Sequence, residues 1–120
     1  MSHWSIWHNP KCSKSRQSLE LLRNNGIEPE VFEYLKTPPT SQQIEKASQN
    51  LNLPLADFTR KKEAIYKELN PKDEAELLAA MVENPILIER PIVQYKNKAV
   101  LGRPPENIET LIKMQNEENA

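Results

Sequence analysis

The single cysteine of the chain stands among positively charged residues. Cys12 lies between Lys11 and Lys14, with Arg16 close behind, where an apolar strand pattern over residues 4–7 becomes a helical pattern. Free N–H groups and the positive end of the dipole gather at a helix start, and with the nearby cations they favour a thiolate. We therefore expect Cys12 to be a nucleophile whose pKa lies below about 8.5, the value of a free thiol. The alternative is a small buried hydrophobe, which normally sits in an apolar run.

Having only one cysteine restricts the redox chemistry of the chain. Ser15 stands where a Cys-x-x-Cys motif would place its second sulfur, so no internal disulfide can resolve an adduct on Cys12. External thiols must therefore complete any redox cycle. A lone free cysteine also suits a reducing compartment. Neither the apolar run of about 7–15 residues that marks a secretory signal nor the roughly 18 residues of a membrane span is present, and we expect a cytoplasmic protein.

Three arginines occupy loop positions beside predicted strand ends, namely Arg60, Arg90 and Arg103. A guanidinium group is a planar fork that matches the geometry of an oxyanion. Arg90 precedes Pro91 and Arg103 precedes a proline too, which favours extended backbone at each arginine. Taken singly, each is more typical of a surface position. If they converge on Cys12, they form an oxyanion site beside a nucleophile.

The elements that must position these residues begin with a β-α-β unit over residues 4–35. Its helix is predicted over 13–25 and ends before Gly26, which suits a left-handed helix end, and its second strand covers 30–35. A helical middle follows, with a capping box of Thr40 and Gln43 opening a helix that ends near Leu51. Further helical segments are predicted at residues 53–58 and from Pro71 to position 84.

The last third of the chain predicts a hairpin and a closing helix. Strands are expected at 92–95 and 99–101 with a three-residue turn over 96–98, and Ile108, Leu111 and Ile112 mark the helix. The polar tail 115–120 is expected to fray. A parallel pair plus a hairpin with flanking helices is the thioredoxin-like α/β fold. We predict a mixed four-stranded sheet in one domain, 1–120, with a helical insertion over about 38–88.

The composition of the chain does not indicate which class of ligand it binds, so any binding site must come from the local arrangement of its residues. The chain has 120 residues, 38% hydrophobic and 28% charged, which suits one globular domain. Its net charge of −1 gives no reason to expect nucleic acid or membrane binding. One cysteine and two histidines offer no credible metal cluster, so we expect no metal.

Several motifs, in order along nearly the whole chain, resemble the glutaredoxin-coupled arsenate reductase family. They are His8-Asn9-Pro10-Lys11-Cys12-Ser13-Lys14-Ser15-Arg16, Tyr34-Leu35-Lys36-Thr37-Pro38-Pro39, Arg60-Lys61, Asn84-Pro85-Ile86-Leu87-Ile88-Glu89-Arg90-Pro91-Ile92 and Gly102-Arg103-Pro104. Five separated motifs with family-like spacing are a stronger signal than any one of them.

The resemblance implies a role for each candidate residue. Cys12 would be the catalytic nucleophile, Arg60, Arg90 and Arg103 would bind arsenate, and His8 and Ser15 would tune the thiolate. It also implies a cis peptide bond before Pro91. Considered apart from the resemblance, a protonated His8 would favour the thiolate, although a histidine at a strand end is more often a packed residue. The Asn9 side chain could instead cap the loop.

The resemblance also implies the reaction and its partners. Cys12 would attack arsenic(V), glutathione would attack the adduct, and glutaredoxin would remove the glutathione as arsenite leaves. Glutathione is then a co-substrate, no cofactor is bound, and we expect a monomer. Two other functions remain open. One is an RNA polymerase-binding regulator of the same fold, whose usual Cys-x-x-Cys switch Ser15 removes. The other is a monothiol glutaredoxin-like transferase. Phosphatase-like arsenate reductases need Cys-x5-Arg, and the sixth residue after Cys12 is Ser18.

Overall fold

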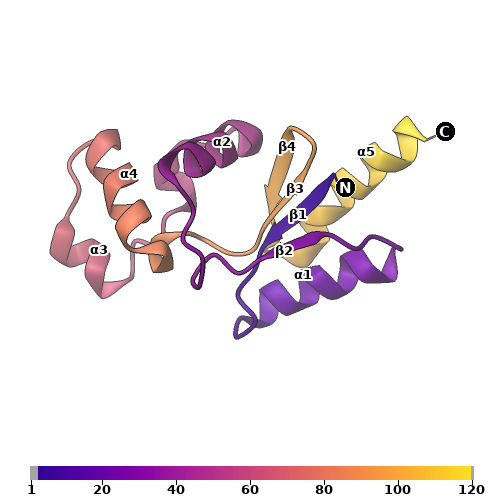
Figure 1. Ribbon diagram of the computed structural model, residues 1–120, viewed down its shortest axis with the longest axis horizontal. Helices are drawn as coiled ribbons and strands as arrows, with labels where there is room; N and C mark the ends of the chain where they lie inside the picture. Colours follow the sequence, from indigo (N-terminus) through magenta and orange to yellow (C-terminus); the bar gives the residue numbers. More distant parts are fainter. Residues whose placement is uncertain (1–2, 120) are drawn as a thin grey trace. The chain divides into compact units, whose positions relative to one another are not determined.

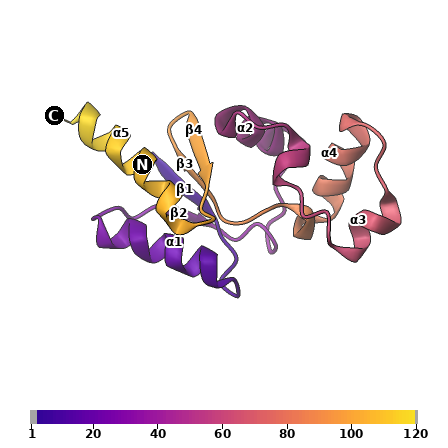
Figure 2. The ribbon, with the colours of Figure 1, turned by 180° about the vertical axis from the view of Figure 1, so that it is seen from behind.

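The computed structural model describes residues 3–119, and Figures 1 and 2 show its helices and strands. The chain forms two compact units. The first combines residues 3–33 with residues 90–119 and contains the sheet, whereas the second covers residues 34–89 and is helical. The second unit matches the predicted helical insertion, with ends a few residues outside the expected 38–88.

The first unit is built on a mixed four-stranded sheet in the order β2-β1-β3-β4. The strands are β1 (Trp4–Trp7), β2 (Glu30–Phe32), β3 (Ile92–Tyr95) and β4 (Lys98–Leu101). Strand β1 pairs in parallel with β2 and antiparallel with β3, and β3 pairs antiparallel with β4. This arrangement confirms the predicted thioredoxin-like α/β fold.

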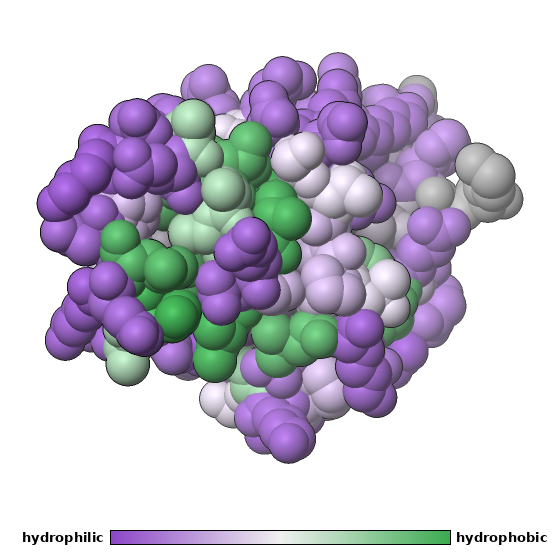
Figure 3. Space-filling view, turned by 60° about the vertical axis from the view of Figure 1, so that its left-hand side comes forward, coloured by the Kyte–Doolittle hydropathy of each residue, from purple (hydrophilic) through white to green (hydrophobic). Residues whose placement is uncertain are grey.

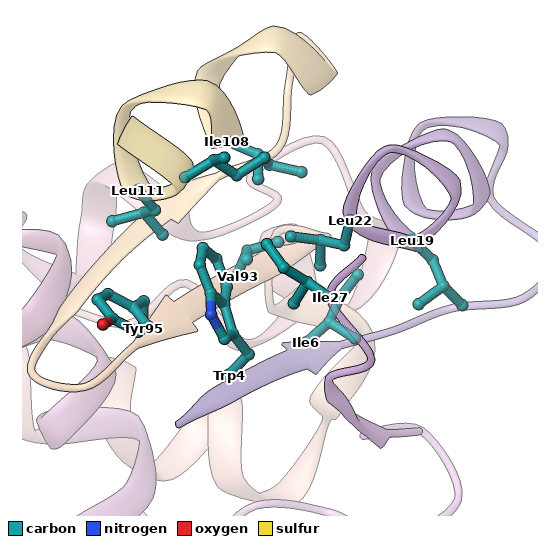
Figure 4. Close-up of a cluster of buried hydrophobic side chains, with 10 residues drawn as sticks. Trp4, Ile6, Leu19, Leu22, Ile27, Val93, Tyr95, Ile108 and Leu111 are labelled. Atoms are coloured by element: carbon teal, nitrogen blue, oxygen red, sulfur yellow. The ribbon is translucent and has the colours of Figure 1, made fainter. Parts of the chain in front are cut away.

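The core of the first unit lies on one face of this sheet. Side chains alternate between the two faces of a strand, so Trp4 and Ile6 of β1 point the same way, as do Val93 and Tyr95 of β3. Helices α1 (Ser13–Asn24) and α5 (Glu109–Glu118) both cover this face, and Figure 4 shows their apolar side chains meeting those of the strands. Burial of this cluster therefore fixes α1 against the sheet.

Helix α1 follows its predicted pattern. Its buried residues are those of the expected face, namely Ser15, Ser18, Leu19 and Leu22, and Cys12 is its N-cap. The helix stops at Asn25, and Gly26 has a positive φ of 74° that only glycine adopts at no steric cost. The sequence thus predicted both ends of the helix to within one residue.

The second unit consists of short helices joined by tight turns. They are α2 (Ser41–Leu51), α3 (Ala64–Leu69) and α4 (Glu74–Glu83), with 3₁₀ turns at Leu55–Phe58 and Pro85–Leu87. The predicted capping box is present, since the Thr40 hydroxyl accepts from the Gln43 N–H at 3.1 Å and the Gln43 side chain accepts from the Thr40 N–H at 2.8 Å. The exposed large apolar side chains here include Leu35, Leu69 and Ile86, and Figure 3 shows apolar surface bordered by hydrophilic residues.

One predicted strand end was wrong, and one short helix was missed. Strand β2 ends at Phe32 rather than at position 35, because its partner β1 ends at Trp7 and the His8 N–H makes the next bond, to the Phe32 carbonyl at 2.8 Å. Helix α3 was not predicted; it is only six residues long, none of them is buried, and no side chain caps its start.

Three predicted features of the second half also need correction. Helix α4 starts at Glu74 instead of Pro71, because the Asp73 carboxylate caps it by accepting from the Glu76 N–H at 2.9 Å. The hairpin turn has two residues, since Lys98 already pairs with Tyr95. The tail does not fray over residues 115–118, which continue α5, because Tyr95 donates to the Glu118 carboxylate at 2.5 Å and Lys96 lies 2.9 Å from it. Position 120 lies outside the described residues.

Between residues 3 and 119 there is no helix with both the length and the apolar character needed to cross a membrane.

Candidate functional site

Cys12 is held at the start of α1 by its own backbone. Its N–H donates to the Asn9 carbonyl at 2.9 Å, and its carbonyl accepts from the Arg16 N–H at 3.0 Å as the helix begins. The residue is partly exposed, so the sulfur can be reached from solvent. One cationic side chain approaches it directly, because Nη1 of Arg103 lies 3.7 Å from Sγ of Cys12. Residues 91 positions apart thus meet at the sulfur.

The surroundings of Cys12 favour its thiolate. Burial of the sulfur raises the pKa of Cys12, but the backbone N–H of Ser15, the charge of Arg90, the N–H of Lys14 and the charge of Arg103 together bring it below the ordinary value. These are the effects expected at a helix start beside cations. The charged side chains involved come from the far end of the chain, whereas the guanidinium of Arg16 donates to the Pro10 carbonyl at 2.9 Å.

Arg90 and Arg103 are carried by two neighbouring loops at one end of the β3–β4 hairpin. Nη1 of Arg103 donates to the Arg90 carbonyl at 3.3 Å, and the Gly102 N–H donates to the Pro91 carbonyl at 2.9 Å. The peptide bond before Pro91 is cis, as the resemblance implied. The Arg103–Pro104 bond is also cis, which the sequence did not lead us to predict.

Gly102 lets the loop of Arg103 approach helix α1 closely. A Cβ atom at this position would overlap Oγ of Ser18 and lie 2.8 Å from Cγ of Pro91. The buried Ser18 hydroxyl donates to the Gly102 carbonyl at 3.3 Å, which ties the loop to the helix that begins at Cys12. Gly102 and Ser18 therefore help to place Arg103, and both were missed as site residues. The available signal was that the chain has only two glycines and one directly precedes a candidate arginine.

His8, Asn9 and Ser15 form a hydrogen-bonded cluster under the cysteine loop. Nδ1 of His8 and Oγ of Ser15 are 2.6 Å apart, and the Asn9 N–H donates to the same oxygen at 3.0 Å. The Asn9 side chain accepts from the Lys11 N–H at 3.0 Å, so it caps the loop as expected. Ser15 is fully buried, and the cluster joins the end of β1 to the first turn of α1.

The surroundings of His8 disfavour a protonated imidazole and agree with the alternative of a packed residue. Burial lowers the pKa of His8, and the charges of Arg23 and Arg16 lower it further against the opposing effect of Glu33. The imidazole is therefore neutral near pH 7, and its direct partner is Ser15. Any influence of His8 on the thiolate must pass through the position of Ser15 and the loop.

Arg60 belongs to the second unit. Its guanidinium lies 2.8 Å from the Glu63 carboxylate and donates to the Ile86 carbonyl at 3.4 Å, while its N–H donates to the Leu87 carbonyl at 2.7 Å. Its convergence with the arginines of the first unit stays a prediction.

The first unit thus unites a thiol of lowered pKa with two guanidinium groups. Such a site can attack an electrophile and hold an oxyanion beside the new bond. In the described part of the chain, no three histidine, cysteine, aspartate or glutamate side chains gather where they could hold a metal ion.

Similarity to known proteins extends along almost the whole chain. The sequence model of the ArsC family matches residues 7–111. The chain belongs to the ArsC family. An Escherichia coli relative bearing the name uncharacterized protein YfgD is 49% identical over 108 residues, which cover 86% of this chain and 91% of that protein.

Several relatives of this ArsC-family chain are named arsenate reductase. The one from Neisseria meningitidis serogroup B is 45% identical over 117 residues, covering 93% of this chain and all of the relative. A solved structure of an arsenate reductase from Vibrio cholerae is 46% identical, superposes with a TM-score of 0.87, and covers 89% of this chain and 95% of its own. The family resemblance of the five motifs is therefore confirmed.

Proposed function

We propose that this ArsC-family protein reduces arsenate to arsenite through a covalent arseno-cysteine on Cys12, using glutathione and glutaredoxin. The observation that carries the proposal is the 3.7 Å approach of the Arg103 guanidinium to the Cys12 sulfur. A cation at this place stabilises the thiolate and lies beside the oxygens of an arsenic atom that the sulfur attacks. The relatives named arsenate reductase support the choice of arsenate as the oxyanion.

The first step forms a bond between sulfur and arsenic. The Cys12 thiolate attacks arsenic(V), and one oxygen leaves as hydroxide or water after taking up protons. Arg90 and Arg103 hold the remaining oxygens through charge-assisted hydrogen bonds. Arg60 completes the oxyanion clamp in this proposal. His8 and Ser15 keep the loop of Cys12 in place, because Ser15 links the Asn9 backbone to the buried imidazole.

The remaining steps need thiols from outside, because Cys12 is the only cysteine of the chain. Glutathione attacks the adduct, and glutaredoxin then takes the glutathione as arsenite leaves and the Cys12 thiolate returns. The two external thiols become a disulfide and give arsenic its two electrons, and their two protons leave with one arsenate oxygen as water. The need for reduced thiols suits a reaction in the cytoplasm, and no bound cofactor is required. The protein acts as a monomer in this scheme.

The proposal is tested by following NADPH consumption in the presence of arsenate, glutathione, glutaredoxin and glutathione reductase. We expect arsenate-dependent oxidation that falls to the blank rate in Cys12→Ala. Arg103→Ala should lose roughly a hundredfold in kcat/KM, the effect of removing one donor to a charged transition state. Gln17→Ala, an exposed change on the same helix α1, is the matched control and should keep full activity. A rate no higher than that of Cys12→Ala would refute the proposal.

A further inference from the structure

Asn107 lies directly behind the loop that carries Arg103. It belongs to the 3₁₀ turn Pro105–Ile108, which precedes α5, and its N–H donates to the Pro104 carbonyl at 3.0 Å. Its side chain folds back over the loop, where Nδ2 donates to the Leu101 carbonyl at 3.1 Å and to the Arg103 carbonyl at 3.2 Å. One amide group thus joins the end of strand β4 to the residue that reaches the cysteine.

The two bonds enclose the segment that sets the direction of Arg103. Gly102 in the middle is fixed by its own bonds to Pro91 and Ser18, and Asn107 fixes the carbonyls on either side. An arginine side chain has many rotamers, so its time near a given partner depends on how firmly its backbone is held. The Cα position and direction of Arg103 therefore limit where its guanidinium can go.

The chemistry of the asparagine side chain suits this task. Its NH₂ group has two hydrogens, one for each carbonyl. Neither aspartate, which has no hydrogen to donate when ionised, nor a hydroxyl, which has one, could make both bonds. The sequence carried no sign of this role, because Asn107 lies in a polar stretch outside the helical apolar pattern.

We propose that Asn107 is a positioning residue for the reaction at Cys12, holding the backbone on both sides of Gly102 so that the Arg103 guanidinium faces the sulfur. The catalytic part of this inference rests on the proposed function, since Arg103 is there assigned to the arsenate oxygens. The positioning part does not, because the Arg103–Cys12 contact exists without substrate.

The first test measures the thiolate without arsenate. Iodoacetamide alkylation of Cys12 is followed against pH in the unsubstituted protein, Asn107→Ala, Arg103→Ala and the double variant. We expect a midpoint below about 8.5 for the unsubstituted protein. Asn107→Ala should raise this pH midpoint, and the increase should be no larger than the one that Arg103→Ala causes. The double variant should match Arg103→Ala, because Asn107 acts only through that side chain.

Matched variants separate positioning from general loss of structure. Asn107→Leu keeps the bulk of the side chain without its donors and should behave as Asn107→Ala. Asn116→Ala removes an exposed asparagine from α5 and should leave the midpoint unchanged. If both Asn107 variants keep the midpoint of the unsubstituted protein, or if their effect adds in full to that of Arg103→Ala, the proposal is wrong. A variant with lowered stability is measured at a temperature where its circular dichroism is native, so the comparison holds.

The second test uses turnover. Asn107→Ala should lower kcat about fivefold, the effect of one ordinary hydrogen bond, and should have no effect in an Arg103→Ala background. If no arsenate is reduced by the unsubstituted protein, the proposed function fails while the alkylation result still decides the role of Asn107. If arsenate is reduced and Asn107→Ala leaves both kcat and the midpoint unchanged, only the positioning role fails.

Discussion

Burial and charge act in opposite directions on the two titratable groups at the start of α1. Burial raises the pKa of the Cys12 thiol, and backbone N–H groups with Arg90 and Arg103 lower it overall. At His8 the leading effect, burial, itself lowers the pKa, so the imidazole stays neutral. With the His8 imidazole neutral, the side-chain charges that lower the Cys12 pKa, and that an oxyanion can meet, are those of Arg90 and Arg103.

The state of His8 predicts how stability depends on pH. In the unfolded chain an ordinary histidine takes up a proton near pH 6.5, whereas the folded protein resists this at His8 because its pKa is lowered. The unfolded state therefore binds more protons at pH values below about 6.5. The His8 contribution to the free energy of unfolding should be fully present above that pH and should be lost as the pH falls toward the folded pKa.

Urea unfolding between pH 7.5 and 5 checks this prediction. His8→Gln removes the titrating group and should flatten the fall in unfolding free energy relative to the unsubstituted protein. Gln17→Ala, an exposed change that removes no titrating group, is the matched control and should leave the slope unchanged. Equal slopes for His8→Gln and the unsubstituted protein would contradict a lowered His8 pKa.

The surroundings of a single residue were predicted correctly from the sequence where its partners lie nearby in the chain. The N-cap place of Cys12 and the capping role of Asn9 follow from neighbours within a few positions. The charges that lower the Cys12 pKa could not be assigned in this way, because Arg90 and Arg103 reach it through the pairing of β1 with β3. A lowered Cys12 pKa was predicted from the nearby Lys11, Lys14 and Arg16. The direction was right, but the side-chain charges that lower the pKa are those of Arg90 and Arg103.

Gly102, at the end of the β3–β4 hairpin, is in close contact with helix α1. Gly102→Ala should lower the free energy of unfolding by about 1–3 kcal/mol, because its methyl group would overlap Ser18 and crowd Pro91. Chemical denaturation measures the change. The Ser18→Ala, Gly102→Ala double variant should recover part of the loss relative to Gly102→Ala, since the closest atom, Oγ of Ser18, is then gone.

The other glycine provides the comparison for this prediction. Gly26 has a positive φ of 74° and open space around its Cα, so Gly26→Ala is strained by its backbone alone. Its cost should be about 1–2 kcal/mol and should not respond to Ser18→Ala. If Ser18→Ala rescues both glycine variants equally, or neither, close packing is not what requires Gly102.

Helices with a clear apolar face were predicted in their places, and a short helix without a buried face was not. Helix α2 has its Thr40–Gln43 capping box and was placed almost to the residue, whereas the uncapped and unburied α3 was missed. The end of β2 was missed for another reason. Glu33 to Leu35 continue the strand pattern in sequence, but a strand extends only as far as its partner allows.

The two units are joined in a way that should make them fold together. Residues 34–89 are inserted between β2 and β3, which flank β1 in the sheet. The sheet of the first unit thus requires the ends of a 56-residue segment to lie about two strand spacings apart, roughly 10 Å. If that segment were unfolded, closing it would cost about 3.5 kcal/mol from its length alone. A folded second unit therefore stabilises the first through chain connectivity.

This connection predicts a single unfolding transition. Trp4 and Trp7 both lie in β1, so tryptophan fluorescence reports on the first unit, whereas far-ultraviolet circular dichroism also detects the helices of the second. The two signals should change at the same urea concentration. Met81→Ala, at a fully buried position of α4, should lower the free energy of unfolding by about 2–5 kcal/mol and should move both urea midpoints down together. Exposed Lys62→Ala should change neither midpoint. A fluorescence midpoint that stays in place while the helical signal moves would show that the second unit unfolds alone, and that loop closure is too small an effect to couple the two.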